Sequence, residues 1–273
     1  MPRSVNTRID RRKNSAIGRT FDAMFGKLSN IFGKKEVIHE PISFSDLKVD
    51  VHSHFIPGID DGAETIEDSL AMIAGMKELG YSKVITTPHV MSDFYRNSSE
   101  DIQRGCDRVR EALLKENIDI EIECAAEYYL DAELMQKVKA KDLLTFGANY
   151  VLFELPFIGE PANFTSVVFE MQLAGYQPVL AHPERYGFWH NDISKYQDIA
   201  DKGVLLQLNM NSLTGHYSPA VKKVAEEMVQ NDLISLIGSD CHNIRHIDLM
   251  KRAACTASMH ALLNKGQLKN ATL

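Results

Sequence analysis

The sequence contains no long run of apolar residues. No stretch of its 273 residues approaches the roughly 20 uninterrupted apolar residues that a membrane-spanning helix needs. The N-terminus also lacks the short apolar core of a secretory signal. We therefore expect a cytoplasmic protein without a membrane-spanning segment.

Cysteine is scarce, and its positions exclude several kinds of site. The four cysteines form no C-x-x-C pair and no close regular spacing, so neither a disulfide framework nor a zinc knuckle is indicated. None is followed by arginine at the spacing of the cysteine-dependent tyrosine phosphatases. A G-x-S-x-G elbow and a G-x-x-x-x-G-K-S/T loop are also absent. These absences argue against a nucleophilic cysteine or serine of those types and against a nucleotide-binding loop of that type.

Positive charge is in short supply, since the net charge is −7. This balance disfavours a nucleic-acid partner, because phosphate backbones select basic faces. Residues 1–36 are the exception, with nine lysines and arginines against three acids. Apolar residues recur at helical spacing from Phe21 to Phe32, which predicts an amphipathic helix that rests on an anionic membrane surface or docks on a partner. The alternative is a tail whose apolar stripe covers the barrel domain expected for the rest of the chain, or covers a neighbouring subunit.

The remainder of the chain alternates between apolar runs of strand length and segments of helical periodicity. We expect strands at residues 47–51, 83–87, 120–125, 150–155, 177–181, 204–208 and 233–238. Helical patterns occupy residues 65–79, 100–115, 164–174, 219–230 and 248–263. This alternation implies parallel strands joined by helical crossovers. We therefore divide the chain into a basic N-terminal arm, residues 1–45, and an α/β barrel domain, residues 46–273.

Side chains able to bind metal follow these expected strands at or just beyond their C-terminal ends. The C-terminal ends of parallel strands form one rim of a barrel, so residues far apart in the sequence converge there. The residues concerned are His52, His54, His89, Glu127, Glu154, His182, Asp240 and His242. The loop from Gly58 to Gly62 adds Asp61, although an acidic turn before a helix capped by Thr65 is an alternative explanation.

The recurrence of these side chains is stronger evidence than any one of them. A lone histidine after a strand is more often a surface or core residue than a ligand. Alternation along an extended strand, however, aims both imidazoles of an H-x-H pair to the same side. Crowded buried carboxylates and imidazoles would be costly without a cation. Such a donor set suits zinc, manganese or iron, and its size exceeds the roughly four ligands of one zinc, so two or three cations are expected.

The motifs resemble those of the polymerase and histidinol phosphatase (PHP) superfamily, and more narrowly the CpsB-type bacterial protein-tyrosine phosphatases of capsule and exopolysaccharide systems. The resemblance covers residues 47 to about 263. It is carried by Val49 to His54, Gly58 to Gly62, Thr87 to His89, Ala126 to Tyr128, Phe153 to Pro156, His182 to Tyr186 and Ser239 to Asn243. It implies a distorted TIM-like barrel of about seven βα units with a site for up to three cations, manganese foremost.

The resemblance also implies a role for each matching residue. The first cation would be held by His52, His54, Glu127 and Asp240, the second by Glu127, Glu154 and His182, and the third by Asp61, His89 and His242. Arg185 matches an arginine beside the substrate phosphate, for which a surface ion pair with Glu184 or Asp192 is the alternative. The family's second arginine falls on Ile247, so Arg245 is its nearest equivalent. Asp50 is interpreted as a supporting residue.

By this resemblance the substrate would be phosphotyrosine in a protein, namely a tyrosine kinase of capsule or exopolysaccharide biosynthesis. A phosphatase of a small ester such as histidinol phosphate would share every ligand. It would differ in rim residues, for which the candidates are Tyr128, Phe157, Phe188 and Trp189. A nuclease of the same superfamily would need a basic groove. A metal-binding module without turnover would be expected to have lost some ligands.

Overall fold

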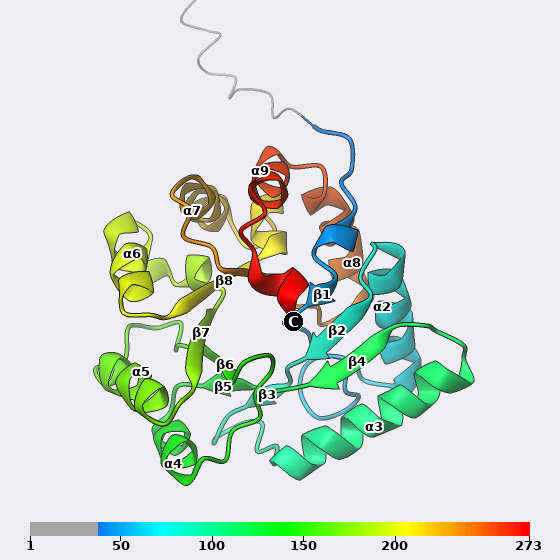
Figure 1. The fold of residues 1–273 in the computed structure, drawn as a ribbon, viewed down its shortest axis with the longest axis horizontal. Helices are drawn as coiled ribbons and strands as arrows, with labels where there is room; N and C mark the ends of the chain where they lie inside the picture. Colours follow the sequence, from blue (N-terminus) through cyan, green and yellow to red (C-terminus); the bar gives the residue numbers. More distant parts are fainter. Residues whose placement is uncertain (1–37) are drawn as a thin grey trace, which may run out of the picture. The chain divides into compact units, whose positions relative to one another are not determined.

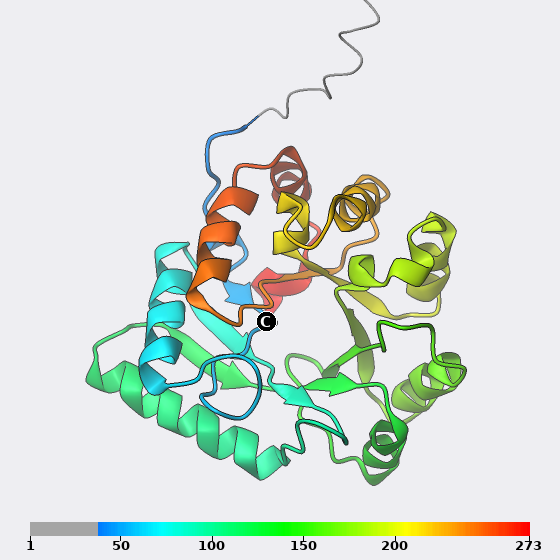
Figure 2. The same ribbon diagram turned by 180° about the vertical axis from the view of Figure 1, so that it is seen from behind.

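Residues 38–273 are described by the structure, which is a computed structural model. Within residues 39–273 the strands form a ring with helices around its outside, and both views show this arrangement (Figures 1 and 2). The predicted α/β barrel is confirmed. The amphipathic helix predicted between Phe21 and Phe32 lies outside the described residues, and the division between residues 45 and 46 stays a prediction.

The strands are short and run parallel. Their bounds are β1 Val49–Asp50, β2 Lys83–Thr86, β3 His89–Val90, β4 Glu121–Cys124, β5 Glu127–Tyr129, β6 Tyr150–Glu154, β7 Gln177–Ala181, β8 Leu205–Asn209 and β9 Leu236–Gly238. They form one sheet in the order β1-β2-β4 and a second in the order β3-β5-β6-β7-β8-β9. Because β3 continues the path of β2 and β5 that of β4, seven strand positions are present in the described part of the chain, as the sequence predicted.

Backbone hydrogen bonds close the ring between its first and last strands. Ser53 and Cys241 form a parallel bridge beyond the ends of β1 and β9. Asp240 N donates to His52 O at 2.8 Å, and His54 N donates to Cys241 O at 3.0 Å. The two ends of the ring are therefore joined at the rim where the candidate ligands lie.

Helices cover the outside of the ring. Their bounds are α2 Ile66–Glu78, α3 Ser99–Lys115, α4 Ala132–Ala140, α5 Phe164–Leu173, α6 Ile193–Asp201, α7 Pro219–Gln230, α8 Ile244–Ala253 and α9 Ala257–Lys265. The single helix predicted for residues 248–263 is wrong, because the chain turns between α8 and α9. Thr256 makes that turn: its Oγ1 donates to Ala253 O and accepts from Met259 N, which caps α9. No helix in residues 38–273 is long and apolar enough to cross a membrane.

Two apolar clusters stabilise the barrel. The larger cluster lies between strands and helices, and the smaller includes Val51, Ile85, Val179 and Leu236. The C-terminal segment packs at the centre of the ring, where both views place the chain end. There Asn270 Nδ2 donates to Val49 O and Ile237 O, and its Oδ1 accepts from Ile237 N. This buried amide satisfies backbone groups of the first and last strands together.

Candidate metal centre

The predicted ligands converge at one rim of the barrel. His52 Nε2 lies 3.2 Å from Glu127 Oε2 and 3.4 Å from Asp240 Oδ1. His54 Nε2 lies 3.7 Å from Glu127 Oε2 and 3.4 Å from Asp240 Oδ1. The H-x-H pair therefore faces the same two carboxylates, as the alternation of an extended chain requires. All four side chains are buried.

The remaining candidates extend this group to both sides. His89 Nδ1 lies 3.0 Å from Glu127 Oε2 and 3.4 Å from Glu154 Oε1. His182 Nε2 lies 3.0 Å from Glu127 Oε1. The half-exposed Asp61 approaches the rim through Oδ1, 3.4 Å from His89 Nε2 and 3.3 Å from His242 Nε2. All nine predicted ligands thus lie in one continuous cluster.

Donor atoms in the cluster gather into overlapping groups of the size that a cation needs. These groups are His52, His54 and Glu127; His52, His182 and Asp240; His89, Glu127 and Glu154; and His54, Asp61, His89 and His242. The last contains the whole third set implied by the resemblance. His89 also faces the carboxylates of the second set, so it lies between two groups.

Several atoms of the cluster that could bind a cation are buried without a hydrogen-bond partner. They are His52 Nε2, His54 Nε2, His89 Nδ1, His182 Nδ1 and Glu127 Oε2. Buried polar atoms are normally hydrogen-bonded, and each unsatisfied one costs about 1–3 kcal/mol. Four of these five atoms face one another across the rim. Cations bound among them would satisfy them, so the residues present fit a metal centre.

Three of the imidazoles are oriented by a hydrogen bond at Nδ1. His52 Nδ1 lies 2.8 Å from Gln207 Oε1, His54 Nδ1 lies 2.8 Å from Asp60 Oδ2, and His242 Nδ1 lies 3.0 Å from Asp240 O. Because each partner is an acceptor, each Nδ1 carries a proton, and Nε2 is the nitrogen left to bind a cation. In each ring Nε2 is directed into the cluster.

The loop of residues 58–62 folds back onto His54, which follows the first strand. Ala63 N donates to His54 O at 3.0 Å, and Asp60 Oδ2 accepts from His89 N at 3.1 Å. Gly62 lies so close that a Cβ on it would stand 2.2 Å from His54 O. Only glycine fits this contact, which places Asp61 over His89 and His242.

The electrostatics of the cluster show an excess of carboxylate. Burial alone would lower the pKa of His52, but Glu127 and Asp240 raise it to about 9. Burial and repulsion from Glu127 raise the pKa of Glu154 to about 8. Without cations, the raised pKa values favour protonated His52 and Glu154. Bound cations would balance the same negative charge and displace these protons.

Arg185 lies at the edge of the cluster and pairs with Asp240. Its Nη1 donates to Asp240 Oδ2 at 2.8 Å, and Asn209 Nδ2 donates to the same oxygen at 2.9 Å. The guanidinium carbon lies 4.3 Å from the centre of the Tyr217 ring and 5.1 Å from that of Phe157. The alternative of a surface ion pair with Glu184 or Asp192 is wrong, because among the described residues Arg185 forms its ion pair with Asp240, and Glu184 is buried and accepts from Ser212 Oγ and Asn209 N.

Other predicted residues lie away from the cluster or support it. Arg245 is exposed at the start of α8, and in residues 38–273 no ion pair joins it to the cluster. Tyr128 and Trp189 are buried in the core, so their assignment to the rim is wrong, whereas Phe157 stacks at 6.0 Å on His182. Asp50 accepts from Ser239 N and Oγ, which fits a supporting role.

Sequence reasoning missed Gln207, Asn209 and Tyr217, and of the two carboxylates in the loop of residues 58–62 it assigned a role to Asp61 but not to Asp60, which contacts His54. The first two lie in β8, the one strand for which no ligand was expected. Gln207 alternates with Asn209 along the strand, and both point to the rim, where they contact His52 and Asp240. A polar pair at this spacing in a buried strand was the available signal.

The fold and the site define a metal-dependent enzyme of the α/β-barrel class. The family model for capsular polysaccharide synthesis, CpsB/CapC, matches residues 48–266. The chain belongs to this family. Tyrosine-protein phosphatase YwqE of Bacillus subtilis is 30% identical over 198 residues, which is 72% of this chain and 78% of that protein. Tyrosine-protein phosphatase CpsB of Streptococcus pneumoniae is 26% identical over 202 residues, 72% of this chain and 83% of that protein.

A solved structure agrees with these relatives. It comes from crystal structures of YwqE from Bacillus subtilis and CpsB from Streptococcus pneumoniae, described as unique metal-dependent tyrosine phosphatases. Its TM-score is 0.70 at 27% identity, and the match covers 81% of this chain and 94% of that one. An amidohydrolase from Mycoplasma synoviae, 12% identical with a TM-score of 0.50 over 88% of this chain and 89% of that one, shares the fold.

Proposed function

We propose that the nine clustered residues hold two or three divalent cations, and that phosphotyrosine is hydrolysed on them. The chain is a metal-dependent tyrosine-protein phosphatase of the CpsB/YwqE type. The observation that carries the metal assignment is the set of buried imidazole and carboxylate atoms that have no hydrogen-bond partner. The donor set suits manganese, with iron and zinc as alternatives. We expect manganese.

Each part of the cluster has a distinct task. Bound cations would supply Lewis acidity for the phosphoryl oxygens and activate a water molecule. Glu127 is the shared ligand, because its two oxygens face His52, His89 and His182. Gln207 and Asp60 hold the imidazoles of His52 and His54 in the orientation that leaves Nε2 free.

Arg185 and Phe157 are placed to bind the substrate. The planar guanidinium of Arg185 has one donor on Asp240, and its other donors remain for phosphoryl oxygens. Phe157 is 48% exposed beside His182 and Arg185. Its ring offers an apolar face on which the phenyl group of phosphotyrosine can stack. An aryl ester is therefore favoured over a small alkyl ester.

The protein substrate is proposed from the family alone. Members belong to capsular polysaccharide synthesis, so the phosphoprotein would be a tyrosine kinase of capsule or exopolysaccharide biosynthesis. The basic arm of residues 1–36 would bring the enzyme to an anionic membrane surface or to that partner. Sedimentation with anionic liposomes, compared between the full chain and a chain lacking residues 1–36, tests the arm. Equal sedimentation of both forms would exclude membrane contact.

A substrate comparison tests the activity itself. A phosphotyrosine peptide and histidinol phosphate are each offered to the manganese-loaded protein, with His52→Ala as the blank. We expect the peptide to be turned over faster, chelator to abolish turnover, and thiol alkylation to leave it intact. Faster turnover of histidinol phosphate would show that the small-ester alternative is correct.

A further inference from the structure

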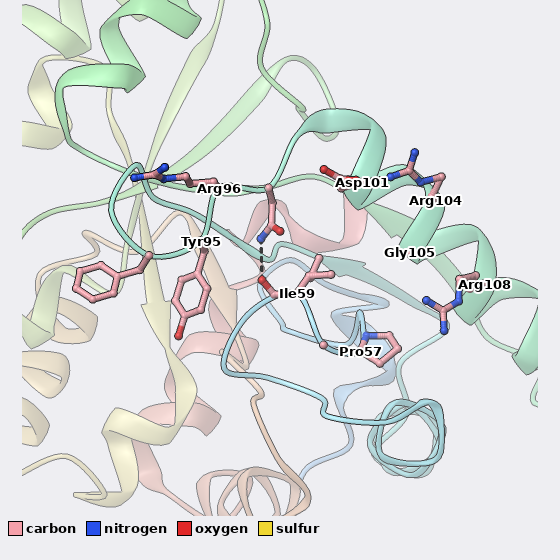
Figure 3. A pocket seen from close by; sticks show the side chains of 11 residues that line it. Pro57, Ile59, Tyr95, Arg96, Asp101, Arg104, Gly105 and Arg108 are labelled. Atoms are coloured by element: carbon pink, nitrogen blue, oxygen red, sulfur yellow. Dashed lines mark hydrogen bonds and ion pairs between the residues drawn. The ribbon is translucent and has the colours of Figure 1, made fainter.

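A second concave site includes two residues that contact the metal centre, and Figure 3 shows the side chains that line it. A cavity of about 430 Å³ is enclosed by residues 57–59 after β1, residues 94–97 after β3, and the first turns of α3. These loops follow the C-terminal ends of their strands, so the pocket opens on the face that carries the cluster. Its volume is sufficient for a charged side chain.

Positive charge dominates the pocket wall. Arg96, Arg104 and Arg108 line it, and Asp101 is the single acid among the lining residues. Asp101 is already engaged, since it accepts from Ser98 at the start of α3 and pairs with Arg104. Arg108 has no ion pair or hydrogen bond among residues 38–273. On a chain of net charge −7, such a concave group of arginines favours an anionic ligand.

Two residues join the pocket wall to the metal centre. The ring of Tyr95 stacks on the imidazole of His89, with 5.5 Å between centroids and 14° between planes. Asn97 Nδ2 donates to both Ile59 O and His89 O at 2.9 Å. The loops that form the pocket are therefore tied to a candidate ligand, and a polypeptide bound at the centre passes close to the pocket.

Apolar groups complete the surface that a polypeptide would meet. Phe94 lines the pocket and is 78% exposed, and Ile59 and Pro57 line it as well. An exposed aromatic ring beside the unpaired Arg108 fits a peptide better than a free ion, because peptide backbone and side chains can pack on the ring.

We propose that this pocket binds an anionic side chain of the substrate polypeptide close to the scissile phosphotyrosine. The inference rests on the proposed function, because it assumes a polypeptide at the metal centre. The guanidinium groups fit a carboxylate or a phosphate equally well, since both present oxygens in a fork.

A peptide series tests this pocket. The parent peptide carries phosphotyrosine as its only charged side chain, and the others add one glutamate or one phosphoserine at successive positions on either side. The readout is the ratio of kcat/KM for each anionic peptide to that for the parent. We expect a preference of about threefold to tenfold at the favoured position. It should weaken as salt is raised.

Variants of Arg108 connect the preference to the pocket. Arg108→Glu should abolish or reverse it, and Arg108→Lys should retain part of it. Arg252→Ala, an exposed arginine on α8, is the matched control and should keep it. Equal use of all peptides by the unaltered protein, or an unchanged preference in Arg108→Glu with a native melting curve, would overturn the pocket assignment while the proposed function stands. No hydrolysis of any peptide would overturn both.

Discussion

At the scale of single residues, the side-chain amide of Gln207 orients a candidate metal ligand, His52. Its Oε1 lies 2.8 Å from His52 Nδ1, and its Nε2 donates to Leu208 O at 2.7 Å. The side chain is thus fixed from both ends and holds His52 in one tautomer. Ligand-orienting partners of this kind typically contribute 10-fold to 100-fold in metal affinity, by order of magnitude.

Gln207→Ala should therefore weaken manganese binding by about 10-fold to 100-fold, with the fold retained. Isothermal titration of metal-free protein measures this. Gln197→Ala is the control, because Gln197 is exposed on α6 and bonds only to Asp201 among the described residues. Equal affinities in the two variants would show that Gln207 does not orient a ligand.

Asp50 provides a prediction about pH. Burial raises its pKa to about 7, and the hydrogen bonds from Ser239 offset part of this effect. Because the folded pKa lies above the ordinary value of 3.8, the folded state takes up a proton as the pH falls. Its contribution to stability is present below about pH 4 and is lost as the pH rises through about 7.

Asp50→Asn should flatten this dependence in metal-free protein, because asparagine keeps the neutral form. In the variant the asparagine amide can donate to Ser239 Oγ. The Ser239 hydroxyl, which donates to Asp50 Oδ2 in the unaltered protein, can then donate to His52 O, 3.0 Å away. Melting curves between pH 5 and about 8 in the presence of chelator compare the two proteins. A fall in Tm of equal size in both would contradict the linkage.

At the scale of elements, the loop of residues 58–62 depends on a close backbone contact. A Cβ at Gly62 would stand 2.2 Å from His54 O, so Gly62→Ala must displace the loop and with it Asp60 and Asp61. We expect a destabilisation of about 1–3 kcal/mol and a loss of most activity. Gly159→Ala, where nothing lies within 4 Å, is the matched control. Denaturant unfolding and peptide turnover measure the two effects, and native values for Gly62→Ala would refute this account of the loop.

The strands and most of the helices could be predicted from sequence patterns. Strand positions and the ligands at their ends followed from alternation and from the geometry of parallel barrels. Two helices were missed because each is nine residues long and buries only two side chains, Leu134 and Val138 in α4 and Tyr196 and Ile199 in α6. Two buried residues show the helical spacing only once, and a single spacing does not identify a helix.

The partners of the ligands could not be predicted for a different reason. Gln207 reaches His52 across 155 residues of sequence, and Arg185 reaches Asp240 across 55. Both contacts depend on how the ring closes, which sequence spacing does not determine. Tyr128 and Trp189 show the converse error, because they were assigned to the rim from their place beside rim motifs although they fill the core.

At the scale of the whole molecule, the barrel brings nine candidate ligands from distant segments into one cluster, in which several buried atoms have no hydrogen-bond partner. Cation removal should therefore lower the melting temperature. Binding to the folded state alone adds about 2.7 kcal/mol when free metal is 100-fold above Kd. Scanning calorimetry with manganese or with chelator measures the shift, and identical curves would show that no cation stabilises the cluster.

The central claim is that this cluster binds the cations on which phosphotyrosine hydrolysis depends. The most direct measurement is the rate at which metal-free protein hydrolyses a phosphotyrosine peptide as manganese is added in known equivalents. The account predicts no turnover at the start, a rise to a plateau at about two or three equivalents per chain, and a flat response for His52→Ala. Full turnover in the presence of chelator, or the same rise in His52→Ala, would contradict it.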